Sequence, residues 1–261
     1  MEILDIMAFG QPLGEVSISQ YVIPSLAAFI AAVIGGMSGY GTGLLLPPVL
    51  IPILGAEAVV PVVSLSALIT NATRVVTFWN SFDFNKIKKV TIYASPACVV
   101  GAYGYTLLSG PIVSIIIGLT LILIAPARRY LLRKHGNLGT RSLNAASVGY
   151  GILAGGTSGS GVVLISILLS TGLSGVSVIA TDAGISFLLG VLKVIVFQSA
   201  GSLPFHLWAM AAVIGISAIP GTLLAKCLIN MLSGQMHITI INAVVLLGGG
   251  ALIIEGVRGV I

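Results

Sequence analysis

Long apolar runs separated by short polar stretches make up almost the whole chain. Runs of this kind, with few charged residues over about 18 positions, predict membrane-spanning helices. The sequence therefore predicts an all-α, polytopic membrane protein. We expect apolar segments at residues 20–38, 44–54, 57–79, 90–108 and 112–126 in the first half, and at 143–156, 162–171, 176–198, 205–229 and 238–254 in the second.

Two of these segments, 44–54 and 162–171, are too short to cross a bilayer as straight helices. About twelve residues at 1.5 Å each reach about 18 Å, against about 30 Å for the hydrocarbon core. Each follows a glycine cluster, Gly35–Gly43 and, 120 positions later, Gly155–Gly161. Glycine costs a helix about 1 kcal/mol relative to alanine, so both clusters should interrupt helices. Such breaks must be buried in protein or line a wet cavity, and matched breaks indicate a transporter's substrate site.

The second half of the chain repeats the plan of the first. The most polar stretch separates the two copies, so we divide the membrane domain into residues 1–135 and 136–261. If residues 21–54 form a hairpin, the chain crosses the bilayer five times between the glycine clusters, and the second copy is inverted. A single crossing there would give a parallel repeat instead. We favour two inverted five-segment repeats, each with an interrupted first member.

Composition excludes other classes of protein. Only 7% of residues are charged, 57% are hydrophobic and the mean hydropathy is +1.13, which is too apolar for the surface of a soluble domain. Most of the net charge of +5 lies in two basic stretches, 80–89 and 128–141. By the positive-inside rule both should be cytoplasmic loops of a cell-membrane protein, and the N-terminus is then outside if residues 21–54 form a hairpin. The expected surroundings are therefore a lipid bilayer, and nucleic acid is not an expected partner.

The glycine clusters also indicate an anion site. A helix that begins directly after each break would present free N–H groups and a partial positive charge at its N-terminus. Hydroxyls would add donors, and oxyanions of tetrahedral sulfur or phosphorus suit such an array. The alternative is that the glycines only allow helices to pack closely. The predicted binding residues at the breaks are Gly36, Ser38, Gly39, Gly41, Thr42, Gly156, Thr157, Ser158, Gly159 and Ser160.

Four polar residues inside the apolar segments complete the candidate site. Arg74 and Lys193 occupy positions that match within one residue in the two halves. A charge at such depth costs about 2.5–3.5 kcal/mol and marks a substrate path, although a long side chain can also snorkel to the headgroups. Asn71 would orient the ligand or bond to a neighbouring helix. Asp182 would carry a coupling proton, or cap its helix near the interface.

An enzyme is not expected from these residues. Gly36-Met37-Ser38-Gly39 fits the G-x-S-G pattern of intramembrane serine proteases, but such an enzyme needs a histidine close to the serine. The pattern recurs in the second half, and the histidines all lie in loops or at span ends: His135, His206 and His237. Cys98 and Cys227 are expected to be small buried hydrophobes. We predict no cofactor and no metal site.

With these residues in view, the chain resembles the TauE/SafE family of sulfite and sulfonate exporters. The resemblance rests on the first glycine cluster with Pro47, on its second copy from Gly155, and on the small-residue segment 95–101. It covers essentially the whole chain, although the second copy lacks the third glycine and the proline, at Val163 and Ile167. The resemblance implies transport of anions such as sulfite, thiosulfate, sulfoacetate or other organosulfonates, often as export.

Together these features predict a secondary transporter of sulfur-containing anions. The anion would sit near the midplane between the two glycine breaks, exposed to each side in turn as one repeat rocks against the other. A proton or the membrane potential would supply the energy, because no nucleotide-binding motif is present. A passive anion channel, an intramembrane protease and a membrane subunit without transport activity are the alternatives. The anion, the direction, the coupling ion and the oligomeric state, a homodimer included, stay open.

Overall fold

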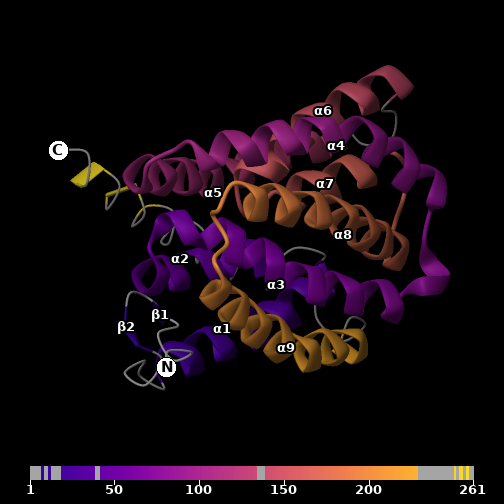
Figure 1. The fold of residues 1–261 in the computed structure, drawn as a ribbon. Helices are drawn as coiled ribbons and strands as arrows, with labels where there is room; N and C mark the ends of the chain where they lie inside the picture. Colours follow the sequence, from indigo (N-terminus) through magenta and orange to yellow (C-terminus); the bar gives the residue numbers. More distant parts are fainter. Residues whose placement is uncertain are drawn as a thin grey trace.

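The computed structural model of the protein describes residues 7–8, 11–12, 19–38, 42–133, 139–228, 250, 253–254 and 257–258. The last predicted span, 238–254, and the loop before it lie almost entirely outside these residues. In the described part, two-residue strands β1 (Met7–Ala8) and β2 (Gln11–Pro12) pair antiparallel. The rest is helical, which confirms the all-α prediction (Figure 1): α1 (Ser19–Ser38), α2 (Thr42–Leu54), α3 (Ala56–Thr77), the 3-10 turn η1 (Trp79–Ser81), α4 (Phe84–Thr106), α5 (Gly110–Arg133), α6 (Thr140–Gly156), α7 (Gly161–Leu169), α8 (Val176–Ser199) and α9 (Phe205–Leu228).

The predicted short helices are present in both halves. Thirteen-residue α2 follows α1, and nine-residue α7 follows α6. The second break is a true interruption, because Thr157 is extended and Gly159 has a φ of 87°. Glycine reaches that left-handed region without the strain that a Cβ would add. The residues of the first break between α1 and α2, 39–41, lie outside the described part.

The two basic stretches are less loop-like than predicted. Helix α4 already begins at Phe84, and α5 continues to Arg133, so much of 80–89 and 128–141 is helical. The cause at α4 is Asp83, whose carboxylate accepts a hydrogen bond from the backbone N–H of Lys86 at 3.0 Å. Lysine and arginine are good helix formers, so a basic run does not end a helix.

Helices α3 and α8 form the centre of the molecule and run in opposite directions. Arg74 near the end of α3 lies beside Asp182 near the start of α8, and Leu68 lies beside Gly190 at their middle. Tyr105 links their other ends, because its hydroxyl donates to Ala56 and its ring packs on Phe197. Opposite directions require an odd number of reversals between these two matching helices. An inverted repeat has that property, and the inverted relation of the two halves stays a prediction.

The outer helices pair across the two halves. Figure 1 shows α4 with α6 on one side of α3 and α8, and α1 with α9 on the other. Within each outer pair the helices are parallel: Ala94 and Cys98 of α4 face Gly151 and Gly155 of α6 in that order. The glycines at these contacts have no side chain, so the backbones of the two helices approach each other closely.

Several features of the bundle fit a bilayer. Among the described helices, α3, α8 and α9 are long and apolar enough to cross a membrane, and 24 residues of α8 reach about 36 Å. Aromatic side chains gather at both ends, as is typical of membrane interfaces. Trp79 packs edge-on against Phe82, and at the opposite end Trp208 donates a hydrogen bond to Gln198. Because α4 and α6 are parallel, both basic stretches begin a helix at the same end of the bundle.

Candidate functional site

A cavity of about 120 Å³ lies between the central helices and the two glycine breaks. Its lining residues on α3 fall within 63–74 and those on α8 within 182–193. A constant offset of 119 residues relates the two lining segments. The cavity is therefore built from matching parts of the two halves.

The start of α2 touches the second break at this cavity. The Ser158 hydroxyl donates a hydrogen bond of 2.7 Å to the carbonyl oxygen of Gly43. A Cβ placed on Gly43 would lie 2.9 Å from the backbone nitrogen of Gly159. Thr42, the first residue of α2, and Ser160, the N-cap of α7, both line the cavity. The N-termini of two helices, with their free N–H groups, thus border one space.

Most of the predicted binding residues line this cavity. Gly156 does not; it packs against Gly101 of α4 instead. Ser38 ends α1 and nothing of its side chain is described, while Gly39 and Gly41 lie outside the described residues. The predicted residues that line the cavity are Gly36, Thr42, Asn71, Arg74, Thr157, Ser158, Gly159, Ser160, Asp182 and Lys193.

The predicted hydroxyl donors divide into two kinds. Thr157 donates to the carbonyl oxygen of Leu153 at 2.8 Å, and Ser158 donates to that of Gly43. Each hydroxyl has a single hydrogen, so these two are already used as donors. Thr42 and Ser160 make no side-chain hydrogen bond within the described part of the chain. Among the described hydroxyls at the breaks, these two are free to donate to a ligand.

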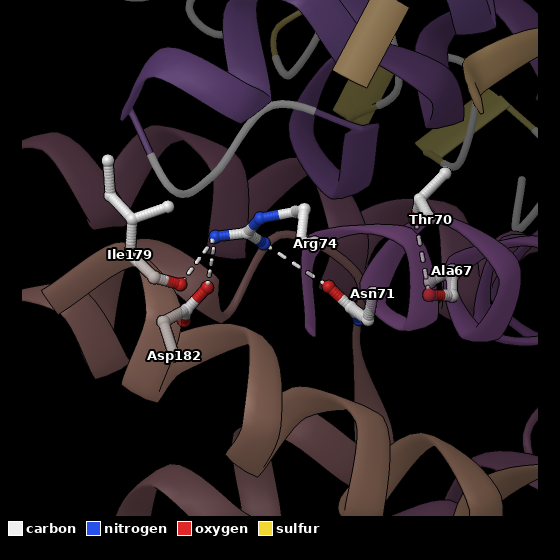
Figure 2. Close-up of polar contacts among 6 residues, drawn as sticks. All are labelled: Ala67, Thr70, Asn71, Arg74, Ile179 and Asp182. Carbon is white, nitrogen blue, oxygen red and sulfur yellow. Dashed lines mark hydrogen bonds and ion pairs between the residues drawn. The ribbon is translucent and has the colours of Figure 1, made fainter. Parts of the chain in front are cut away.

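Arg74 is held by three oxygen atoms in the bundle interior (Figure 2). One terminal nitrogen lies 3.0 Å from the Asp182 carboxylate and 3.1 Å from the carbonyl oxygen of Ile179, and the other lies 3.2 Å from the side-chain oxygen of Asn71. Arg74 is 7% exposed and Asp182 is 1% exposed. Snorkelling of Arg74 to the headgroups is therefore not observed. Asn71 bonds to an arginine of its own helix, not to a neighbouring helix.

Asp182 does not cap its helix. It is the seventh residue of α8, whose N-cap position is Gly175. The capping alternative is therefore wrong, because the helix starts earlier and Asp182 faces Arg74 inside the bundle. Its role in proton coupling stays a prediction.

Lys193 differs from Arg74 in lacking a partner. It lines the cavity and is partly buried, but it makes no ion pair or hydrogen bond with the described residues. The described charges around the cavity are thus two cations and one carboxylate. Because Asp182 balances Arg74, the excess positive charge lies on Lys193.

Several cavity residues are absent from the sequence-based set, among them the polar residues Ser64, Thr70, Tyr150, Ser186 and Thr222. The Thr70 hydroxyl donates to the carbonyl oxygen of Ala67 on its own helix (Figure 2). A signal for Tyr150 existed, since it is the sole aromatic residue of segment 143–156. No comparable signal distinguishes Ser186 from other serines in apolar segments.

The described residues do not place a histidine next to Ser38. Gly36 of α1 lies against Thr222 and Ala225 of α9, whereas His206 lies near the start of α9. Sixteen residues separate His206 from Thr222, about 24 Å along the helix. His135 and His237 lie outside the described residues.

A bundle of apolar helices, three of them long enough to cross a membrane, in which two short helices begin at one cavity is the architecture expected of a membrane transport protein. The chain belongs to the sulfite exporter TauE/SafE family, a family of transporters, whose model matches residues 25–253 and so covers most of the sequence. No curated protein and no solved structure matches the chain. Sulfite or sulfonate export is the type of membrane transport that this membership indicates.

Proposed function

We propose that the protein is a secondary transporter that exports sulfur-containing anions such as sulfite, thiosulfate, sulfoacetate or other organosulfonates. The observation that carries this proposal is the cavity where two helix N-termini meet beside an unpaired lysine. Helix N-termini and cations both stabilise anions, and they are most effective where water is scarce. Family membership then selects sulfur oxyanions among the anions that such a site could hold.

The charges in the cavity favour an anion that engages Lys193 first. Arg74 is already neutralised by Asp182, while Lys193 has no carboxylate opposite it in the described part of the chain. Burying an unpaired cation in a membrane protein costs free energy. An anion bound beside Lys193 would offset this cost, and the N–H groups at the starts of α2 and α7 would add hydrogen bonds.

Transport would proceed by alternating access to a site that lies between two inverted repeats. The opposite directions of α3 and α8 support the inverted arrangement, and the shared end of the two basic stretches supports a cytoplasmic location for that end of a cell-membrane protein. The membrane potential or a proton gradient would drive the anion. One charge moved through 100 mV gains about 2.3 kcal/mol, enough for roughly fifty-fold accumulation.

Purified protein in liposomes tests this proposal. The panel is sulfite, thiosulfate, sulfoacetate and isethionate, with chloride and acetate as control anions. We expect saturable uptake of at least one sulfur anion and faster uptake of labelled anion when the unlabelled anion is trapped inside. A passive channel would not show this acceleration, and an absence of flux for the whole panel would refute transport.

Ser38→Ala separates transport from proteolysis. A protease would lose all activity with its nucleophile, whereas a transporter should keep reduced but measurable flux, because the anion has other donors. The matched variant is Ser158→Ala, the corresponding serine of the second break. Cleavage of a membrane peptide by the wild type but not by Ser38→Ala would contradict the transport proposal.

A further inference from the structure

The Arg74–Asp182 pair leaves one polar atom of each side chain without a partner. Within the described residues, neither Arg74 Nε nor Asp182 Oδ1 makes a hydrogen bond, although both atoms are buried. Both side chains line the proposed anion cavity. Buried polar atoms are nearly always satisfied in folded proteins, so these two atoms are available to bind a ligand that enters the cavity.

We propose that the anion and a proton bind together, the anion displacing Asp182 from Arg74 and the proton binding to Asp182. This inference rests on the proposed transport function and deepens it by naming the coupling ion. The proton comes from the water of the compartment to which the cavity is open, and it returns to water when the anion leaves on the other side. Because an inward proton gradient opposes this exit, export would be driven by the membrane potential, which acts on the one net negative charge that a divalent anion and one proton carry together.

Because Asp182 is buried, its carboxylate needs either Arg74 or a proton to compensate its charge. The ionised carboxylate is stable at 1% exposure because it faces a guanidinium at 3.0 Å. Once an anion occupies Arg74, the carboxylate is left without a counter-ion, which costs several kcal/mol in a buried site. A proton removes that charge. Conversely, protonation of Asp182 frees Arg74 for the anion, so each ligand strengthens binding of the other.

Lys193, the other cation of the cavity, is too far away to act as a counter-ion for Asp182. Lys193 lies eleven residues further along α8, about 16 Å along the helix axis. It is placed to attract the anion into the cavity, whereas Arg74 is released to the anion only after Asp182 takes up the proton.

The remaining titratable groups near Asp182 are few. From α6, Tyr150 lines the same cavity. From α4, the backbone N–H of Asp83 bonds to Thr181, but its carboxylate caps the N–H of Lys86. Cys98 of α4 is a buried thiol that packs against α6. The described residues of α7 and η1 contain no titratable side chain, and those of α1 contain only Tyr21. Asp182 is the cavity carboxylate among the described residues.

Proton uptake by the wild-type protein is the first test. Thiosulfate and sulfoacetate are the probes, because both stay fully ionised near neutral pH and bind no proton themselves. Adding either probe to purified protein in weakly buffered detergent should take up about one proton per bound anion. Binding without proton uptake would overturn this inference and leave transport standing. Absence of binding and of flux would refute the proposed function itself.

Asp182→Asn supplies the second test, since asparagine has the same shape but cannot take the proton. With the membrane potential clamped at zero, one coupled proton should give the wild type about tenfold anion accumulation per pH unit across liposomes. The variant should accumulate no anion yet still exchange internal for external anion, which also shows that it is folded. The control Asp83→Asn keeps its cap on α4 and should behave as wild type. Accumulation driven by the pH gradient in Asp182→Asn would overturn the proposal.

Discussion

Arg74 and Lys193 occupy matching positions in the two halves, yet their surroundings differ. Arg74 faces a buried carboxylate, a carbonyl and an amide oxygen. At the position that matches Asp182, 119 residues earlier, α3 carries Val63, so the described residues of the cavity wall place no carboxylate near Lys193. Both halves of the chain thus place a cation at the cavity, but within the described part of the chain only Arg74 has a carboxylate as its counter-ion.

This difference gives the two cations different roles, whereas in a symmetric site both would have the same role. A paired cation contributes structure and can be switched by its partner, whereas an unpaired cation contributes attraction for a ligand. The two copies of the fold differ here in one carboxylate, which is present beside Arg74 and absent from the matching position beside Lys193. The following experiments test this division of roles.

The largest effect is expected from breaking the pair. Arg74→Gln should lower the free energy of unfolding by about 3–5 kcal/mol, because Asp182 is left buried without a counter-ion. The double variant Arg74→Gln with Asp182→Asn should regain most of this loss. Thermal unfolding in detergent measures both. Equal stability of the single and double variants would show that the pair has no energetic coupling.

Removal of the unpaired cation should affect transport rather than folding. Lys193→Met should weaken anion transport about ten- to a hundredfold in kcat/KM, the worth of a charged hydrogen bond of about 1.5–3 kcal/mol. Its melting temperature should be equal to or above that of the wild type, because an uncompensated buried charge is gone. Lys193→Arg should keep most activity. A large drop in stability without a drop in kcat/KM would reverse the assigned roles.

Making the two ends alike sharpens the comparison further. Val63→Asp places a carboxylate on the cavity wall at the position that matches Asp182. The introduced carboxylate should neutralise Lys193 and raise the KM for thiosulfate about tenfold, equivalent to about 1.4 kcal/mol. Val63→Asn has a similar size without the charge and is the control. Equal KM values for the two variants would show that Lys193 does not act through its charge.

The smallest effect concerns the contact between the breaks. Gly159 and Gly172 both have a φ of 87°, but a Cβ on Gly159 would lie 2.5 Å from Leu44, while one on Gly172 would meet nothing within 4 Å. Alanine at either position should cost about 1–2 kcal/mol for the left-handed backbone. Gly159→Ala should additionally slow transport. Equal transport by both variants would remove the contact from the mechanism.

Hydrophobic patterning predicts the helices of this protein well. The segment predicted at 176–198 is α8 at Val176–Ser199, and both short segments are found within a few residues. The bounds of these helices follow from the length and composition of each apolar segment, so they can be predicted without knowing how the helices pack. The basic stretches were predicted less well, because a single cap, Asp83, and the helix propensity of lysine and arginine outweigh polarity.

The candidate site was predictable in its residues more than in their partners. Glycine breaks and intramembrane charges identify the cavity, since both are costly in lipid. The link between Arg74 and Asp182 spans 108 positions and leaves no local pattern. Likewise, Thr157 looks like a ligand donor in the sequence, but its hydroxyl bonds to the preceding turn of its own helix, a local competition that threonine often enters.

The cross-pairing of outer helices limits how such a carrier can flex. Gly221 of α9 lies against the carbonyl oxygen of Phe29 in α1, and Gly155 of α6 lies against that of Cys98 in α4. Sliding these backbones apart would expose bare peptide groups to lipid. Each rigid body of the transport cycle is therefore expected to contain helices from both halves of the chain. The boundary between the moving bodies would then not coincide with the midpoint of the sequence.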